Sequence, residues 1–358
     1  MENKASLYSG CLLGVAVGDA MGYPVDKKSW DEICQTYGPN GLLGYDLANG
    51  SAEITSYTQL AAFVCNGLLL QQMRGSTRQH EQYTALALRE WAKSQQFRTV
   101  TEKTKCWVAQ VPGMRRRLCM DTRMLDALNR QTLGTPEAPV LVSATPGALT
   151  GALAAGLCLH REEKALAAQI GARTVAMTHG DPEAFVSGGF IACAVAGILQ
   201  QPESPLQQVY EEALQLVEEL FAAYPQTLIL AQRIRKAFSL TRDPELTPLA
   251  AMTVLGCTTA GECVAGAVYA SIIHSGNFDE AMIAAVNHSG RSSAVASLTG
   301  GLLGARLGQE ALPEFYLESL ENSDVLLELA EDLVQGRQLS RIFDDRWDQK
   351  YIQGMPAH

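Results

Sequence analysis

The chain has 358 residues, of which 47% are hydrophobic and 18% are charged, a composition typical of a soluble globular protein. Its formal net charge is -10, and its basic residues are scattered apart from one short cluster at 115–117. This balance argues against DNA or RNA as the main partner, and the acidic excess is most simply explained by a solvated surface.

The nine cysteines form no CxxC pair, and none lies beside histidines at the spacing of zinc ligands. Most lie within apolar stretches, as Cys11 and Cys193 do, where a buried thiol packs as a small hydrophobic group. The N-terminus carries no signal-peptide pattern, so a cytoplasmic protein is expected. The apolar segment 249–273 contains Glu262 and many small polar residues, which favours a core helix over a membrane span.

Helical periodicity of apolar residues dominates the chain, and no convincing alternating strand pattern occurs. Two predicted helices begin with an N-cap residue followed by proline, at Asp181-Pro182 and at Ser204-Pro205. We therefore predict an all-α fold, a single compact multi-helix bundle domain over 1–358. The predicted helices are 5–21, 58–74, 79–94, 145–160, 162–177, 182–200, 205–223, 226–238, 249–275, 278–287, 292–307 and 324–335.

Two of these helices carry glycine at every fourth position. Gly10, Gly14, Gly18 and Gly22 form the first stripe, and the second runs through 300–308 at the same spacing. Each interior glycine costs about 1 kcal/mol relative to alanine. Such stripes persist where another backbone or a ligand approaches closely, and tight helix packing alone would explain both.

Three segments resemble the ADP-ribosylglycohydrolase family. The sequence GCLLGVAVGDAMGYPVD at 10–26 is similar to the family's opening helix, GxxxGxAxGDAxGxPxE. The sequence THGDPEA at 178–184 resembles its central TH-x-DP-x-A helix start, and 287–308 follows the frame of its motif NxGGDxDTxGAIxGxxxGAxxG. The landmarks occur in the family's order and span almost the whole chain, so the resemblance implies the all-α fold of that family.

The resemblance also implies a chemistry, which is metal-assisted hydrolysis of an ADP-ribosyl bond. In the family, two magnesium ions lie in a cleft of the helical bundle, polarise the ribose and are held by carboxylates. These come from a Thr-Asp-Asp-Thr segment, from an Asp-x-Asp-Thr segment near the C-terminus and from a mobile glutamate after the first helix. Hard divalent cations require such oxygen ligands.

This chain departs from the family at each of those positions. Thr55-Ser56-Tyr57-Thr58 stands where the family has Thr-Asp-Asp-Thr, and SGRSSA at 289–294 stands where it has Gly-Gly-Asp-x-Asp-Thr. All four aspartates are replaced, and Asp26 takes the place of the mobile glutamate. Asp26 and an arginine cannot balance two Mg²⁺ in a desolvated site, so we predict no metal site and no cofactor.

The cleft itself is expected to remain, with a neutral lining of hydrogen-bonding side chains. Arg291 is expected either as a fixed cation where a metal would lie or as an ordinary surface arginine. Tyr57 would either stack on a base or fill the emptied space, and filling is favoured because a tyrosine adds much volume. The predicted ligand-binding residues are Asp26, Thr55, Ser56, Tyr57, Thr58, Asn287, His288, Ser289, Arg291, Ser292 and Ser293.

A metal-free glycosidase would need two carboxylates beside the bond, and Asp26 with Glu53 is the only pair that the motifs offer. Asp19 is expected to be structural, hydrogen-bonded within the turn that ends the first helix. His179 is expected to be a helix-start residue, because the family keeps a histidine there away from the metals.

Three functions remain open from the sequence. The leading one is a catalytically inactive protein that binds an ADP-ribose-like ligand, an ADP-ribosylated protein or a protein partner, with no nucleic acid or membrane involved. The second is a metal-independent or otherwise altered ADP-ribosyl or N-glycosyl hydrolase that uses Asp26 or Glu53. The third is a structural or oligomeric scaffold with a collapsed cleft.

Overall fold

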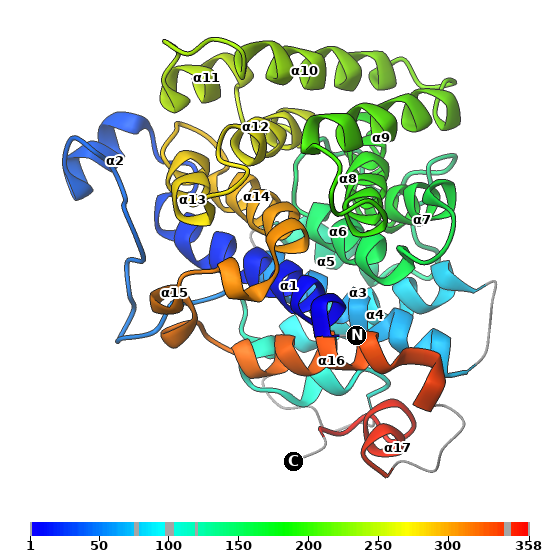
Figure 1. The fold of residues 1–358 in the computed structure, drawn as a ribbon. Helices are drawn as coiled ribbons and strands as arrows, with labels where there is room; N and C mark the ends of the chain where they lie inside the picture. The colour runs from blue at the N-terminus through cyan, green and yellow to red at the C-terminus, as the bar shows by residue number, and fades with distance from the viewer. Residues whose placement is uncertain (1, 75–78, 97–103, 119–120, 340–344, 357–358) are drawn as a thin grey trace.

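The computed structural model describes residues 2–74, 79–96, 104–118, 121–339 and 345–356. The chain is 69% helical, and the described residues contain no strand, which confirms the all-α prediction. The described helices pack around one hydrophobic core and form a single compact domain (Figure 1).

The α-helices in chain order are α1 (Glu2–Gly22), α2 (Trp30–Tyr37), α3 (Ser56–Met73), α4 (His80–Gln96), α5 (Thr122–Leu128), α6 (Leu149–Leu159), α7 (Lys164–Ala176), α8 (Pro182–Gln200), α9 (Leu206–Leu220), α10 (Gln226–Leu240), α11 (Pro248–Leu255), α12 (Ala260–Ile273), α13 (Phe278–Val286), α14 (Ser292–Leu307), α15 (Glu314–Glu318), α16 (Ser323–Leu339) and α17 (Asp345–Tyr351). Short 3-10 helices follow α1 (η1, Tyr23–Val25), precede α5 (η2, Trp107–Gln110 and η3, Gly113–Arg115) and follow α14 (η4, Gln309–Ala311).

The two glycine stripes face each other where α1 packs antiparallel on α14. A Cβ atom built on Gly14 would lie 2.1 Å from the carbonyl oxygen of Gly300, and one built on Gly304 would lie 1.9 Å from that of Gly10. No side chain fits at these distances, so the backbones are in direct contact. The interpretation of the stripes as tight helix packing is confirmed.

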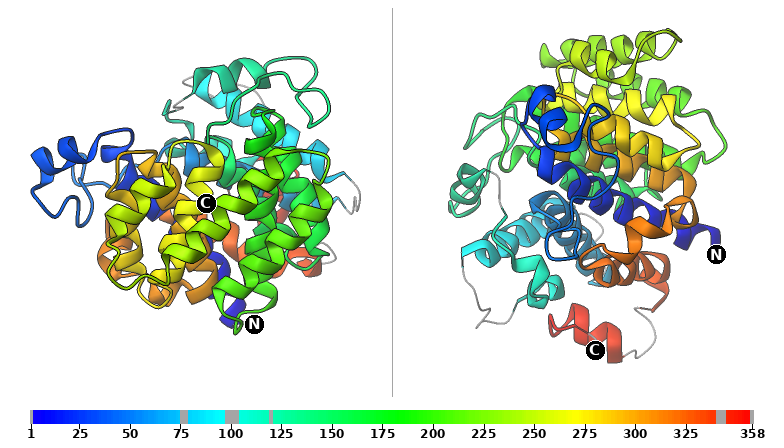
Figure 2. Two further views of the ribbon diagram at one scale, coloured as in Figure 1. Left: turned by 90° about the horizontal axis from the view of Figure 1, so that it is seen from above. Right: turned by 90° about the vertical axis from the view of Figure 1, so that its left-hand side faces the viewer.

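The α1 and α14 pair lies at the centre of the bundle, and the other helices surround it (Figure 1). α3, α6, α7 and α8 pack in succession on one side, while α12 and α13 contact α14 on the other. α10 and α11 lie at one end and α16 and α17 at the opposite end. α2 and the loop after it project from the body (Figure 2). The motifs at the ends of α1, α3 and α14 therefore meet inside the bundle.

The helix predicted over 249–275 is wrong as a single element. α11 ends at Leu255, and the next two residues, Gly256 and Cys257, have φ values of 85° and 54°. α12 then begins after a new capping box between Thr259 and Glu262. The positive φ values turn the chain between two helices, which apolar periodicity does not reveal.

The two proline-marked helix starts differ. Asp181 accepts a hydrogen bond from the backbone of Glu183 and caps α8, as predicted. Ser204 is not the N-cap of α9, because that helix begins one residue later, with Pro205 at the N-cap and no side-chain capping bond.

Two described segments are long and apolar enough to cross a membrane, Lys4–Val25 and Pro182–Gln200. In each, 89% of the apolar window is buried inside the fold, as in the core helices of soluble proteins. In the described parts of the chain eight cysteines are free thiols, and all but Cys34 are buried.

Candidate functional site

Asp19 connects the end of α1 to the start of α3. Its fully buried carboxylate accepts hydrogen bonds from the backbone and hydroxyl groups of Thr55, at 2.7 and 2.6 Å, and of Thr58, at 3.0 and 2.6 Å. Burial raises the pKa of Asp19, although the four hydrogen bonds act in the opposite direction. Asp19 is thus structural, but its partners are the N-cap residue and the first turn of α3 and not the turn that ends its own helix.

Asp26, Arg291 and Tyr57 form a second buried cluster beside this junction. Asp26 Oδ1 accepts a hydrogen bond from the backbone of Ser293 at 3.2 Å, and its Oδ2 lies 3.5 Å from Arg291 Nε. Arg291 Nη2 donates to the hydroxyl of Tyr57 at 3.4 Å. The side chains of Arg291 and Asp26 are 15% and 1% exposed. Arg291 is therefore a fixed buried cation, and the alternative of a surface arginine is wrong.

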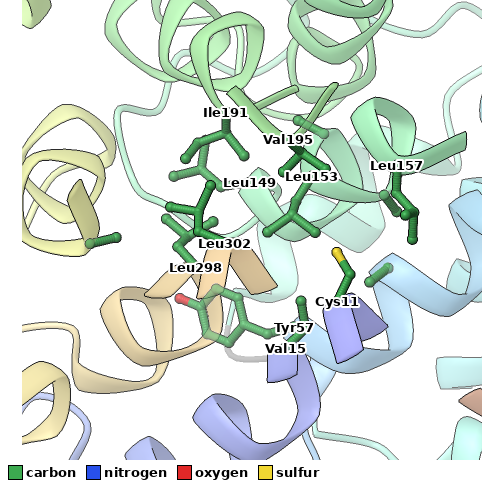
Figure 3. Packing of buried hydrophobic residues seen from close by; sticks show 14 of the residues in the cluster. Cys11, Val15, Tyr57, Leu149, Leu153, Leu157, Ile191, Val195, Leu298 and Leu302 are labelled. Atoms are coloured by element: carbon green, nitrogen blue, oxygen red, sulfur yellow. The ribbon is translucent and has the colours of Figure 1, made fainter. Parts of the chain in front are cut away.

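Burial raises the pKa of the Asp26 carboxyl, and the neighbouring Arg291 guanidinium lowers it. Burial likewise raises the pKa of the Tyr57 hydroxyl, so this group is a neutral phenol. The Tyr57 ring belongs to the hydrophobic cluster that includes Val15 and Leu298 (Figure 3). Tyr57 thus fills space at the start of α3 and presents its hydroxyl to Arg291.

A cavity of about 180 Å³ remains in front of this cluster. It lies where the N-terminal ends of α3, α5, α6 and α14 come together, since its lining includes the first residues of α3, the start of α5, the loop before α6 and the N-cap of α14. The lining residues are Lys27, Ser56, Tyr57, Asp121, Arg123, Met124, Thr145, Gly147 and Arg291.

Three of the predicted ligand-binding residues, Ser56, Tyr57 and Arg291, line this cavity, and Asp26 lies behind Arg291. Thr55 and Thr58 are instead hydrogen-bonded to Asp19.

Two further predicted residues hold the segment after α1 in place. Asn287 exchanges two hydrogen bonds of 2.8 Å with the backbone of Leu42, and the hydroxyl of Ser289 accepts one from the backbone of Trp30. Neither residue belongs to the cavity lining.

The remaining predicted residues of the loop between α13 and α14 contact backbone carbonyl groups at the end of α13 or stabilise Asp26. His288 Nε2 lies 3.0 Å from the carbonyl oxygen of Ala285, and the Ser292 hydroxyl donates to that of Val286. Ser293 contributes its backbone N–H to Asp26. These polar side chains shape the loop between α13 and α14 and do not line the cavity.

Glu53 is paired away from the cavity. Its carboxylate bonds to Arg116, which also bonds to Glu321 at 2.7 Å. Asp26 is meanwhile paired with Arg291, and neither carboxylate is among the cavity-lining residues. The structure does not bring the predicted pair together on opposite sides of a bound substrate.

His179 supports the loop before α6. Its two ring nitrogens lie 2.9 Å from the Thr178 hydroxyl and 3.1 Å from the Thr145 hydroxyl. Burial lowers the pKa of His179 to about 4, so the ring is neutral near pH 7. His179 thus contacts Thr145, a lining residue that the sequence did not single out.

Residues 1–342 match the sequence model of a family described as ADP-ribosylglycohydrolase. The chain belongs to the ADP-ribosylglycohydrolase family. An uncharacterized protein of Archaeoglobus fulgidus is 29% identical to it over 346 residues, which cover 94% of this chain and 97% of that protein. A solved structure described as an ADP-ribosylglycohydrolase-related protein complex is 20% identical, with a TM-score of 0.58 and coverage of 94% of this chain and 100% of the other. That likeness shows the shared fold.

The cluster of Asp26, Arg291 and Tyr57 does not fit the pair of magnesium ions that the motif resemblance implies. Within the described ranges, no group of three histidine, cysteine, aspartate or glutamate side chains is arranged to hold a metal. The carboxylate of Asp26 faces the guanidinium of Arg291, which repels cations and donates hydrogen bonds. Mg²⁺ requires several oxygen ligands in near-octahedral geometry, and this cluster supplies one carboxylate that is already paired.

Three buried histidines predict how stability depends on pH. Burial lowers the pKa values of His160, His179 and His288 from 6.5 to about 4. Between pH 6.5 and 4 the unfolded chain binds protons that the folded chain does not, so stability falls as the pH falls through this window. The raised pKa values of Asp19 and Asp26 act in the opposite direction at the acidic end.

We expect each of these histidines to contribute up to about 1.4 kcal/mol per pH unit to that slope. Urea unfolding of the wild-type chain and of His160→Gln, measured at several pH values from 7 to 5, tests this. The variant is expected to show the shallower slope. Equal slopes would mean that His160 titrates alike in both states.

Proposed function

We propose that this member of the family is catalytically inactive and binds an ADP-ribose-like ligand, free or attached to a protein, without a metal ion. The observation that carries the proposal is Arg291. The motif resemblance aligns it with a metal-binding aspartate of the family, and in the structure it is paired with the carboxylate of Asp26 and lines a cavity. A positive charge fixed by the protein replaces the charge that metal ions would supply.

The cavity supports binding in preference to a collapsed scaffold. It retains about 180 Å³ although Tyr57 occupies part of the region. Hydroxyl groups of Ser56 and Thr145 lie in the lining together with the cationic side chains. Arg123 is 58% exposed, so a ligand attached to a protein can approach from its side.

The metal-free hydrolase has less support. Asp26 is paired with Arg291 and Glu53 with Arg116, and neither of these two carboxylates lines the cavity. Asp121 does line it, but Arg123 holds this carboxylate with two hydrogen bonds and lowers its pKa. A low pKa opposes the role of general acid.

Thermal melting with ADP-ribose tests the proposal, because a ligand that binds only the folded state raises the melting temperature. We expect the same upward shift in EDTA and in Mg²⁺, together with no hydrolysis of an ADP-ribosylated protein substrate above the protein-free rate. A shift that requires Mg²⁺, or turnover that EDTA abolishes, would contradict the proposal.

Two matched variants give the melting experiment its control. Arg123 and Arg235 are 58% and 57% exposed and each pairs with one acidic side chain, but only Arg123 lines the cavity. Arg123→Glu is expected to reduce the ADP-ribose shift strongly, whereas Arg235→Glu is expected to leave it unchanged. If both substitutions changed the ADP-ribose shift equally, ADP-ribose would bind outside this cavity.

A further inference from the structure

Three large hydrophobic side chains are exposed on two neighbouring elements of the bundle. Leu43 and Leu47 lie in the loop after α2 and are 55% and 44% exposed, and Phe315 on α15 is 55% exposed. Exposed hydrophobic side chains that occur singly are normal, whereas a group of them on adjoining elements marks an interaction site. None of the three lines the cavity described above, so the function proposed for that cavity does not explain their exposure.

The loop and α15 are held against each other, so the three side chains belong to one surface. The rings of Tyr45 and Tyr316 meet edge to face with their centroids 5.1 Å apart, and the Phe315 ring lies 4.4 Å from that of Tyr316. Farther along the loop, Ala52 forms a β-bridge with Leu320. α2 and this loop project from the body of the bundle (Figure 1 and Figure 2), which leaves the surface open to a partner.

The surroundings of these side chains are acidic. Glu314 and Glu318 lie on α15 and Asp46 lies in the loop; all three are exposed, and among the described residues none of them forms an ion pair. One cation lies nearby, because Lys28 is 6.0 Å from the ring centroid of Tyr37, whose hydroxyl donates to Asp46. The surface therefore keeps an excess of negative charge.

The segment that carries α15 supplies no cation to balance this charge. Residues 308–336 contain eight acidic residues and no lysine or arginine. Arg116 and Lys350 pair with three of these acids, and all three follow α15 in the sequence. The two glutamates on α15 are not among them, so their charge is available to a partner.

The negative charge decides which partners fit the surface. It repels DNA, RNA and membranes that contain anionic lipids. Two copies of the chain that met through this surface about a two-fold axis would bring Glu314, Glu318 and Asp46 of both copies together, which opposes such a dimer. A partner that covers the exposed hydrophobic side chains must therefore carry positive charge around its own apolar residues.

We propose that Leu43, Leu47 and Phe315, with the carboxylates around them, form a docking surface for a basic amphipathic segment of another protein. Apolar side chains of that segment pack on the two leucines and the phenylalanine, while its lysines and arginines face the carboxylates. Aromatic side chains at the centre of such an interface supply much of its affinity, and opposite charges at its rim raise the association rate. The docking surface acts independently of the cavity and does not require ADP-ribose.

The experiment selects peptides from a random-peptide phage library against the full chain and titrates the recovered peptides by calorimetry at low and high salt. We expect peptides with net positive charge and bulky apolar residues, whose binding weakens as salt is raised. Leu47→Ser/Phe315→Ser is expected to weaken this binding about tenfold or more. The matched control is Leu228→Ser/Val254→Ser, whose side chains are 61% and 56% exposed on α10 and α11, and it is expected to leave the binding unchanged.

A second pair of variants tests the acidic side chains. Glu314→Gln/Glu318→Gln is expected to weaken peptide binding at low salt about two- to fivefold for each charge, and to reduce its dependence on salt. Glu211→Gln/Glu219→Gln removes two exposed charges from α9 and is expected to have no effect. Melting temperatures of all variants close to that of the wild type show that a loss of binding is not a loss of folding.

The docking surface is overturned if the library yields no binding peptide, or if the recovered peptides bind Leu47→Ser/Phe315→Ser as tightly as the wild type. Binding that salt does not weaken would overturn the basic partner. Self-association of the wild-type chain that Leu47→Ser/Phe315→Ser abolishes, measured by analytical ultracentrifugation, would mean that a second copy covers the surface instead. Since ADP-ribose takes no part in these measurements, each of these outcomes leaves the proposed function standing.

Discussion

Replacing Gly300 with valine is expected to prevent folding or to lower the free energy of unfolding by about 4 kcal/mol or more. A Cβ atom at this position would lie 2.0 Å from the carbonyl oxygen of Gly14, inside the contact between α1 and α14. Both partners at this contact are backbone, so no side-chain rotation relieves the clash and the central helices must separate. Urea unfolding, or the yield of soluble folded protein, measures the effect.

Gly276→Val is the matched control for this substitution. Gly276 lies between α12 and α13, and a Cβ atom there would meet no atom within 4 Å. We expect its free energy of unfolding to change by less than about 0.5 kcal/mol. If Gly300→Val were tolerated as well as Gly276→Val, the close approach of α1 and α14 would not occur in the folded protein.

The second large effect is expected for Arg291→Met at neutral pH. Methionine fills much of the volume of the arginine but leaves the Asp26 carboxylate, whose side chain is 1% exposed, without its ion-pair partner. Removing one member of a buried pair costs about 3–5 kcal/mol. The loss of stability should shrink as the pH is lowered, because the already raised pKa of Asp26 rises further and protonation removes the unpaired charge.

The double variant Arg291→Met/Asp26→Asn separates lost pairing from lost packing. Since it removes both charges, we expect it to recover most of the stability that Arg291→Met loses at neutral pH. Urea unfolding of the wild type, both single variants and the double variant completes the cycle. Additive losses, with no recovery in the double variant, would contradict the buried ion pair between Asp26 and Arg291.

The sequence predicted the long helices well, because they bury broad apolar faces at helical spacing. The bounds of α8 and α14 are those that periodicity and capping predict. The short helix α2 was missed although Ser29 and Glu32 form a capping box, since it lacks a long apolar stripe. The break at Cys257 was also missed, because a positive φ at a non-glycine residue depends on contacts made in the folded protein.

The site was predictable in part. The motif frame located Tyr57, Arg291 and Asp26, which the structure brings together. The motifs also nominated polar residues such as Thr58 and Asn287 as ligand-binding residues, but these form hydrogen bonds within the protein. The sequence alone does not show whether a polar side chain in a motif bonds to a ligand or to another part of the protein.

Most of the cavity's other lining residues lie outside the motifs. Lys27 follows the first motif directly, and Asp121, Arg123 and Thr145 come from a segment rich in loops that only the fold brings to the cavity. The sequence around these residues gives only weak indications that they line a cavity. Asp121 precedes α5 as its N-cap, and Thr145 stands before Pro146 and Gly147 near the start of α6.

The most direct test of the central claim is calorimetric titration of the full chain with ADP-ribose, first in EDTA and then in Mg²⁺. A binding site built on Arg291 predicts the same dissociation constant in both solutions and no heat when Mg²⁺ is titrated alone. Binding that appears only with Mg²⁺, or saturable heat from Mg²⁺ itself, would contradict the replacement of the metal ions by a fixed arginine.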